Sequence, residues 1–291
     1  MPRKTTAVCV ALVSVLFAAL AALISCGGGS ETPGTIGVAV TILPQAEFVD
    51  SVGGEKVEVT VMVPPGADVH VYEPTPGQML AVSRASMYVK VGSGMEFEMV
   101  WMNKLEAANR EMLVVDSSRG IRMFEAGESG GGDPHIWLSP LNAMTMVRNI
   151  CDGLIEVDPE NRVYYERNRD AYLGELDILS KAISNELGRV GKKQFIVLHP
   201  AWSYLARDYG LEQIPIEVEG KEPSGKDIVR VTELAREHDI DVVFAEPQFN
   251  PQSADVIADE IGGRVVFIDP LARDYIDNMR TVLNQLVEGM E

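Results

Sequence analysis

The stretch DPENRVYYERNRDAYLGELDILSKAISNEL, from Asp158 to Leu187, decides how the chain is organised. It opens with a helix start, because Asp158 can cap a helix, Pro159 fits the first turn and Glu160 suits the positive end of the helix dipole. From Asn161 onward it holds no proline and one glycine, and apolar residues recur at three- and four-residue spacing. A helix of about thirty residues is about 45 Å long, which suits a spine between two lobes.

Short runs rich in β-branched residues alternate with helical patterns on both sides of this segment. Strands are expected at 36–43, 57–63, 86–92 and 112–116 before it, and at 194–198, 242–245 and 265–268 after it. Such alternation is typical of parallel β/α packing. We therefore predict an α/β fold of two β/α lobes with parallel sheets, joined by one long rigid helix. The N-terminal lobe is placed at residues 35–157, the linking helix at 158–188 and the C-terminal lobe at 189–291.

The size and charge of the chain agree with two lobes and narrow the choice of ligand. Its 291 residues are too many for one small domain, and 46% of them are apolar, which is enough to form a core. The formal net charge of −18 argues against nucleic acid or an anionic membrane surface as the partner, because both would be repelled. A cation is electrostatically favoured, although solubility alone also accounts for an acidic chain.

The N-terminus contains the zones of an export signal in their usual order. Two basic residues precede an apolar run over residues 7–24, and the sequence Leu-Ile-Ser-Cys closes that run at Cys26. This closing sequence resembles the lipobox of prokaryotic lipoproteins. The resemblance implies a signal peptide at 1–25, cleavage before Cys26, a lipid on its sulfur and a flexible tether at 26–34. The alternative is an uncleaved transmembrane anchor, because the run is long enough to span a bilayer.

The four histidines are the first candidates for a metal site. His70 and His135 lie in loops that contain proline, and both His199 and Asp269 directly follow a predicted strand. Ligands of open β/α sheets bind at the carboxyl ends of the strands, where such residues gather. Three imidazoles and one carboxylate form a ligand set for Zn²⁺. His238 lies at a polar helix end and is predicted to be a solvated residue outside the site.

Five segments carry a resemblance to a known family. They are GADVHVYEPTP (66–76), DPHIWLSP (133–140), VLHPAWSYLARDYGL (197–211), EGKEPS (219–224) and IDPLARDYIDNM (268–279). Together they resemble the metal-specific solute-binding proteins of ABC transporters, the family that takes up zinc, manganese or iron. The similarity runs from about Ile36 to the C-terminus and keeps the motifs in the family's order.

The resemblance implies both a function and a placement of the site. The metal would lie in a cleft between the lobes, with His70 and His135 from the N-terminal lobe and His199 and Asp269 from the C-terminal lobe. The chain would be a monomeric substrate-binding protein outside the cytoplasmic membrane, in the periplasm or at the cell surface. It would capture a divalent transition metal, with zinc as the first choice, and deliver it to the membrane permease, while the lipid anchors it to the membrane.

Two features bear on the choice of metal. Family members specialised for manganese often carry a carboxylate where this chain has His199, and a nitrogen ligand favours Zn²⁺ over the harder Mn²⁺. Many zinc-specific members, however, carry a histidine-rich loop before the second ligand. The corresponding loop here, Phe124 to Asp133, contains no histidine. A manganese- or iron-specific protein of the same family therefore stays open as an alternative.

Three acidic residues are candidates for outer groups around the ligands. Asp68 and Asp133 are placed to orient His70 and His135, or else to cap their own loops. Glu246 follows the predicted strand at 242–245 and should face the same edge of its sheet.

Two other classes of function compete with metal transport. A zinc hydrolase would use three histidines and an open fourth position, with Glu246 as a base. The chain has no His-Glu-x-x-His pair and no nucleophile elbow, and a carboxylate in the fourth position closes the site. We therefore expect no enzyme. An adhesin is the third class, because surface members of the family can contact other macromolecules.

Overall fold

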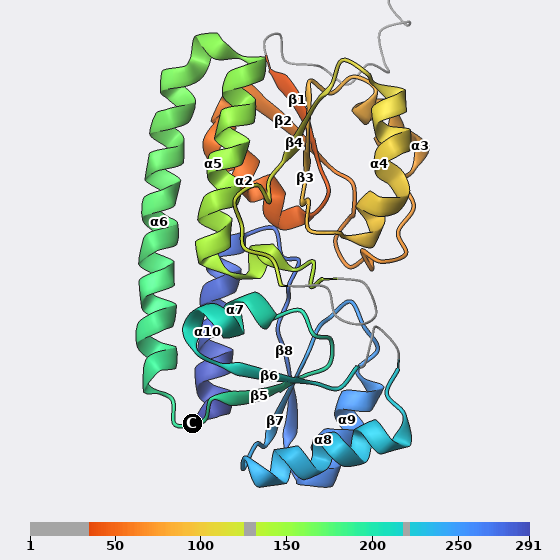
Figure 1. Cartoon of the computed structure of the whole chain (residues 1–291), viewed down its shortest axis with the longest axis vertical. Helices are drawn as coiled ribbons and strands as arrows, with labels where there is room; N and C mark the ends of the chain where they lie inside the picture. The colour runs from red at the N-terminus through yellow and green to blue at the C-terminus, as the bar shows by residue number, and fades with distance from the viewer. Residues whose placement is uncertain (1–34, 125–131, 218–221) are drawn as a thin grey trace, which may run out of the picture. The chain divides into compact units, whose positions relative to one another are not determined.

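The computed structural model in Figure 1 describes residues 35–124, 132–217 and 222–291. The signal peptide, the lipidation of Cys26 and the tether, all predicted from sequence, lie outside these described residues. Within the described ranges no helix combines the length and the apolar character needed to cross a membrane. Residues Ile36–Glu291 form one compact unit.

The N-terminal lobe is built on a four-stranded parallel sheet. Its strands are β1 (Ile36–Val40), β2 (Val57–Val61), β3 (Met87–Lys90) and β4 (Leu113–Asp116), in the order β2-β1-β3-β4. Its helices are α2 (Leu43–Gly53), α3 (Pro76–Val82), α4 (Glu96–Ala108) and α5 (Pro140–Val157). Local sequence sets the start of α3: the Thr75 hydroxyl accepts from the Gln78 N–H, and the Gln78 side chain accepts from the Thr75 N–H.

The C-terminal lobe repeats the same arrangement. Its strands are β5 (Gln194–Val197), β6 (Glu212–Pro215), β7 (Val242–Ala245) and β8 (Arg264–Phe267), all parallel, in the order β6-β5-β7-β8. Its helices are α7 (Ser203–Tyr209), α8 (Gly225–Glu237), α9 (Gln252–Ile261) and α10 (Tyr275–Met290). Two parallel sheets with covering helices confirm the predicted fold class.

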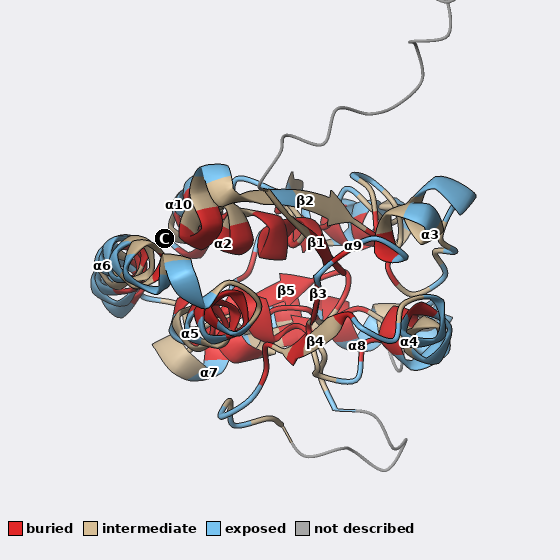
Figure 2. Cartoon of the chain, turned by 90° about the horizontal axis from the view of Figure 1, so that it is seen from above, coloured by how far each residue is buried: buried red, intermediate tan, exposed pale blue. Residues whose placement is uncertain are grey.

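The predicted spine is the helix α6 (Arg162–Arg189), which is continuous over 28 residues. It packs against α5 beside the N-terminal lobe and against α10 beside the C-terminal lobe (Figure 1). Its buried residues share one stripe and are Tyr165, Tyr172, Leu176, Leu179, Ser180, Ile183 and Leu187. Figure 2 shows the opposite side of α6 exposed. The helix is therefore held by one face along its whole length.

One detail of the helix start differs from the sequence prediction. Asp158 makes no capping bond to a backbone N–H, and the turn Pro159–Asn161 is a 3₁₀ helix. The Asp158 carboxylate instead accepts from the Asn161 side chain at 2.6 Å and from the Tyr165 hydroxyl at 2.7 Å. The capping prediction was wrong because these two side-chain donors occupy the carboxylate.

Buried side chains join the two lobes beside the site. The indole N–H of Trp137 donates to the Pro270 carbonyl at 2.7 Å, and the Tyr275 hydroxyl donates to the Trp137 carbonyl at 2.8 Å. Both aromatic side chains are fully buried in one hydrophobic core that includes α5, α6 and α10. On α2, Glu47 accepts from the Tyr172 hydroxyl and from the first N–H of α10, at Tyr275. The segment after His135 is therefore fixed to the C-terminal lobe.

Candidate metal centre

His70 lies in the loop that follows β2. The turn before it is closed by the Ala67 N–H and the Pro64 carbonyl and requires a left-handed residue, which Gly66 supplies at φ +75°. The Asp68 carboxylate accepts from the His70 backbone N–H at 2.8 Å. The His70 Nδ1 lies 2.8 Å from a carboxylate oxygen of Glu96, the first residue of α4. Burial lowers the pKa of His70, but the hydrogen bond to Glu96 and the negative charges of Glu96, Asp68 and Glu217 together outweigh it, so the net pKa is raised.

His135 stands directly before the turn Ile136–Leu138 and is 5% exposed. A single oxygen of Asp133 accepts from the backbone N–H of His135 at 2.9 Å and contacts its Nδ1 at 2.7 Å. Burial lowers the pKa of His135, so that the neutral imidazole is favoured. A neutral imidazole is the form that binds a metal.

His199 follows β5 at the carboxyl end of the C-terminal sheet and is 7% exposed. Its Nδ1 lies 2.7 Å from a Glu217 carboxylate oxygen. Its backbone N–H donates to Glu246 at 3.3 Å, and Glu246 also accepts from the Trp202 indole at 3.3 Å. Burial raises the pKa of Glu246 to about 8. Of the two carboxylates, Glu217 contacts the ring of His199 and Glu246 contacts its backbone.

The three imidazoles converge. One ring nitrogen of each lies within 4.8 Å of those of the other two, and the Nε2 atoms of His135 and His199 are 3.3 Å apart. Each Nδ1 faces a carboxylate, which only accepts hydrogen bonds when ionised, so the proton belongs on Nδ1 and the lone pair on Nε2, the atom that faces the other ring in His135 and His199. Two lone pairs at this separation repel one another unless a cation lies between them.

The separation matches a specific coordination geometry. Zn²⁺ binds histidine nitrogen at about 2.0–2.1 Å with tetrahedral geometry, which places neighbouring ligand atoms about 3.3 Å apart. The three histidines line a cavity of about 10 Å³. This volume has room for about one particle the size of a water molecule. A neighbouring cavity of about 650 Å³ shares these histidines and is also lined by Glu96, Asp133 and Glu217. The carboxylates that line this neighbouring cavity attract cations toward the histidines.

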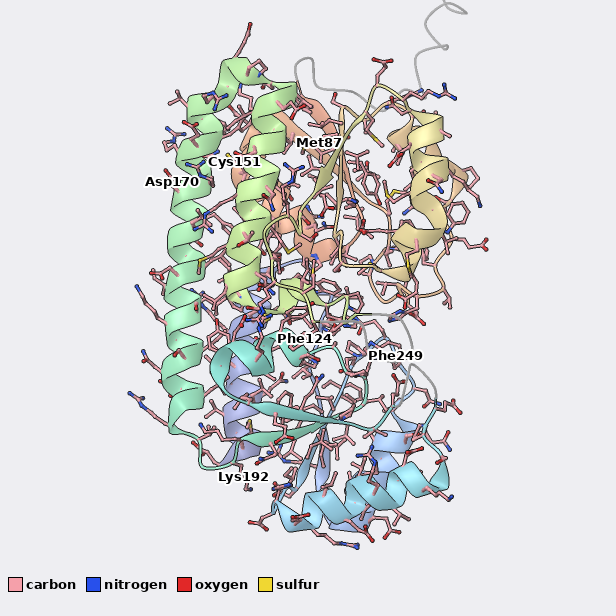
Figure 3. All side chains as sticks on the ribbon, in the orientation of Figure 1. Met87, Phe124, Cys151, Asp170, Lys192 and Phe249 are labelled. Atoms are coloured by element: carbon pink, nitrogen blue, oxygen red, sulfur yellow. The ribbon has the colours of Figure 1, made fainter. Side chains whose placement is uncertain are left out.

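Phe249 closes one side of the imidazole cluster. Its ring centroid is 4.7 Å from that of His199 and 6.4 Å from that of His70. Figure 3 shows Phe249 at the level where the two lobes meet. An aromatic wall excludes water and strengthens electrostatic interactions inside the site.

Asp269 and His238 lie outside the cluster of donor atoms found among the described residues. One Asp269 oxygen accepts from the Gln248 side-chain amide at 2.7 Å and from the Leu271 N–H at 2.8 Å. Asp269 as a metal ligand therefore stays a prediction. His238 is at the C-terminal end of α8, where the sequence predicted a solvated residue.

Two carboxylates that orient the histidines were missed by sequence reasoning. Glu217 follows β6, a strand that the pattern analysis did not find, and Glu96 opens α4 after a glycine-containing loop. Glu217 could have been found from its position just beyond the end of β6. The strand itself was not predicted, because its residues Glu-Gln-Ile-Pro lack apolar alternation. No comparable signal identifies Glu96.

The fold and the site together define a two-lobed protein with a cluster of three histidines whose donor atoms suit a metal ion. Residues 38–289 match the ZnuA family, described as "Zinc-uptake complex component A periplasmic". The chain belongs to this family, which confirms the resemblance inferred from the five motifs. It is therefore a binding component of an uptake system and not an enzyme.

Individual relatives agree with this assignment. The chain is 29% identical to the "High-affinity zinc uptake system protein ZnuA" of Bacillus subtilis, with 94% of this chain and 96% of that protein covered. It is 29% identical to the "Manganese-binding lipoprotein MntA" of Halalkalibacterium halodurans, with 92% and 95% covered. A crystal structure of a ZnuA deletion mutant with zinc bound is 42% identical, has a TM-score of 0.84 and covers 88% of this chain and 98% of its own.

Proposed function

We propose that the chain captures Zn²⁺ outside the cytoplasmic membrane and delivers it to the permease of an ABC transporter. The observation that carries this proposal is the 3.3 Å separation of the Nε2 atoms of His135 and His199, with each Nδ1 against a carboxylate. That spacing suits tetrahedral Zn²⁺. Three imidazole nitrogens also favour zinc over manganese, which prefers oxygen ligands.

Within this proposal His70, His135 and His199 bind the ion. The N-terminal lobe at 35–157 supplies the first two and the C-terminal lobe at 189–291 supplies the third, with the helix at 158–188 between them. Because neither lobe holds all three imidazoles, tight binding requires both. Asp269 is the predicted fourth ligand on the sequence argument alone. Asp68 and Asp133 act through the backbone or ring of the neighbouring histidine.

The proposal includes attachment to the membrane. A signal peptide at 1–25, a lipid on Cys26 and the tether at 26–34 would hold a monomeric body close to its permease. Mass spectrometry of the protein from its native host tests this part, and it should find a lipidated Cys26 as the first residue. An N-terminus upstream of Cys26, or an unmodified thiol there, would contradict it.

The second candidate function is manganese uptake within the same family. Two observations favour it: the loop before His135 contains no histidine, and a manganese-binding relative is 29% identical, the same identity as the zinc uptake protein of Bacillus subtilis. Metal analysis of protein purified from its native host separates the two. One equivalent of zinc in the purified protein would support zinc uptake. One equivalent of manganese would instead support manganese uptake and contradict the main proposal.

Selectivity in vitro adds an independent test. Competition titrations should show Zn²⁺ bound far more tightly than Mn²⁺, because imidazole nitrogen suits zinc. The variant His199→Glu exchanges one nitrogen for oxygen and should narrow this preference. An unchanged ratio of the two affinities would remove His199 from the ligand set.

A further inference from the structure

The segment that carries His135 is held from the C-terminal lobe, although it belongs to the N-terminal lobe in the sequence. The helix α7 of the C-terminal lobe contacts this segment at two points. The Tyr204 hydroxyl donates to the backbone carbonyl of Asp133 at 3.0 Å, two residues before His135. Asp208 accepts a hydrogen bond from the hydroxyl of Ser139, the residue that caps the start of α5. The same helix therefore fixes the chain on both sides of His135.

Tyr204 binds two parts of the N-terminal lobe at once. Besides donating to Asp133, its hydroxyl accepts from the backbone N–H of Phe124 at 3.2 Å. The rings of Phe124 and Tyr204 also pack together, with 4.8 Å between their centroids. Tyr204 is fully buried, and a buried hydrogen bond is costly to lose because its partner is left without one. One buried hydroxyl therefore fixes the backbone at both Phe124 and Asp133.

Arg207, three residues further along α7, reinforces this contact. Its guanidinium donates to the backbone carbonyl of Arg122 at 2.9 Å. The same group lies 5.3 Å from the ring centroid of Phe124 and 4.9 Å from that of Tyr204. A cation over an aromatic face at such distances is attracted to the ring, and the attraction is weaker at an exposed position such as this one. Arg207 therefore supports the contact that the Tyr204 hydroxyl makes.

Hydrogen bonds connect Tyr204 to the ring of His135 through one residue. The Asp133 carbonyl accepts from Tyr204, and the Asp133 carboxylate accepts from the His135 N–H at 2.9 Å and contacts Nδ1 at 2.7 Å. A group that holds the outer nitrogen of a histidine fixes the orientation of the ring. A shift of the Asp133 backbone would therefore turn the imidazole and move its Nε2, which lies 3.3 Å from that of His199.

We propose that Tyr204 is a positioning residue of the metal centre, which holds Asp133 in place and through it the imidazole of His135. Tyr204 acts through Asp133 and does not contact the ion. This inference rests on the proposed function. Because Tyr204 and His199 belong to the same lobe, the C-terminal lobe supplies one ligand and orients a second.

The two tyrosines of α7 provide a matched test, with zinc affinity of the mature protein measured by competition against a chelating dye. Tyr204→Phe removes the hydroxyl and should weaken binding about three- to tenfold, less than the loss typical of a group that contacts a ligand directly. Tyr209→Phe removes a hydroxyl on the same helix that donates to Ser180 of α6 at 2.9 Å. This control should leave zinc affinity unchanged, and urea denaturation measures how far each variant is destabilised.

Two further measurements separate positioning from a general loss of stability. In an Asp133→Ala background, Tyr204→Phe should have no further effect on zinc affinity, because its connection to the imidazole is already broken. In the metal-free protein, nitrogen NMR of the His135 ring should show the proton on Nδ1. Tyr204→Phe should shift this ring toward a mixture of the two tautomers, whereas Tyr209→Phe should not.

Unchanged zinc affinity in Tyr204→Phe, or an equal loss in Tyr209→Phe at similar stability, would overturn the proposal. An undiminished effect of Tyr204→Phe in the Asp133→Ala background would overturn it as well. If Tyr204→Phe does not fold by circular dichroism, Arg207→Leu weakens the same contact from the surface and should reduce affinity about two- to threefold. No loss in that variant would contradict the proposal.

Failure of the proposed function gives a different result. A wild-type protein that bound no zinc would refute zinc capture. The NMR comparison uses metal-free protein, so it still tests whether Tyr204 positions His135. An identical ring spectrum in the wild-type protein and in Tyr204→Phe would overturn the positioning role whatever metal the protein binds.

Discussion

At the scale of single residues, the site depends on which ring nitrogen carries the proton. Carboxylates at 2.7–2.8 Å from each Nδ1 assign that proton and leave the lone pair on Nε2, and the Nε2 atoms of His135 and His199 lie 3.3 Å apart. The lone pairs of these nitrogens repel one another in the absence of a positive charge. A cation bound between them would relieve this repulsion, in keeping with the proposed metal site.

The histidine assignment predicts the effect of two matched substitutions. His199→Ala removes one of three nitrogen ligands and should lower zinc affinity by orders of magnitude, each tenfold step being about 1.4 kcal/mol. His238→Ala removes a histidine at the end of α8, outside the cluster, and should leave the titration curve unchanged. Isothermal calorimetry measures both. Loss of binding in His238→Ala with normal binding in His199→Ala would show that the ligand assignment is wrong.

The raised pKa of Glu246 predicts that the stability of the metal-free protein depends on pH. Its pKa is raised from 4.5 to about 8 by burial, so the folded state keeps a proton that the unfolded state loses above about pH 4.5. Unfolding therefore releases a proton between these values, and the free energy of unfolding falls as the pH rises, by at most about 1.4 kcal/mol per pH unit.

Chemical denaturation from pH 4.5 to 8 measures this effect, with Glu246→Gln as the comparison. The variant cannot ionise at this position, so the stability of the wild-type protein relative to the variant should decrease across the range. A constant difference between the two would mean that Glu246 does not titrate there.

Sequence reasoning identified residues that follow recognisable elements and missed those that do not. His70, His135 and His199 were found because each stands in a loop or beyond a strand that the pattern reveals. Glu96 and Glu217 lie next to segments whose geometry no periodicity encodes. Their importance comes from side-chain hydrogen bonds to histidines distant in the sequence, which only the folded structure shows.

At the scale of elements, long periodic segments were predictable and short polar ones were not. The amphipathic stripe predicted α6, and the β-branched runs predicted seven of the eight strands. The eighth, β6, lies at the edge of its sheet and has the mixed burial of a strand with one neighbour. Its sequence Glu-Gln-Ile-Pro holds one β-branched residue, so no apolar pattern marks it, whereas the other edge strands β2, β4 and β8 are rich in valine.

The packing of α6 predicts different effects for two isoleucines on the same helix. Ile183 is 1% exposed in the core, and Ile178 is 63% exposed. Ile183→Ala should lower the free energy of unfolding by about 2–5 kcal/mol, because it removes buried methyl groups and leaves a cavity. Ile178→Ala should change it by no more than about 0.5 kcal/mol. Urea denaturation measures both, and equal effects would refute the orientation of the helix.

At the scale of the whole molecule, two sheets of the same strand order present the carboxyl ends of their strands to one site. His70 and His135 come from one lobe and His199 from the other, and α6 packs beside both. The bonds of Trp137 and Tyr275 join the lobes next to His135. The three-histidine cluster is therefore a property of the assembled pair of lobes, and under the proposed function metal capture depends on the arrangement of the lobes.

A crystal structure of the zinc-loaded mature protein, with anomalous diffraction recorded at the zinc absorption edge, tests the central claim most directly. We expect one strong anomalous peak about 2.0–2.1 Å from the Nε2 atoms of His70, His135 and His199 together. A peak bound through other residues, or the absence of any peak among these three imidazoles in protein that contains one equivalent of zinc, would contradict the account.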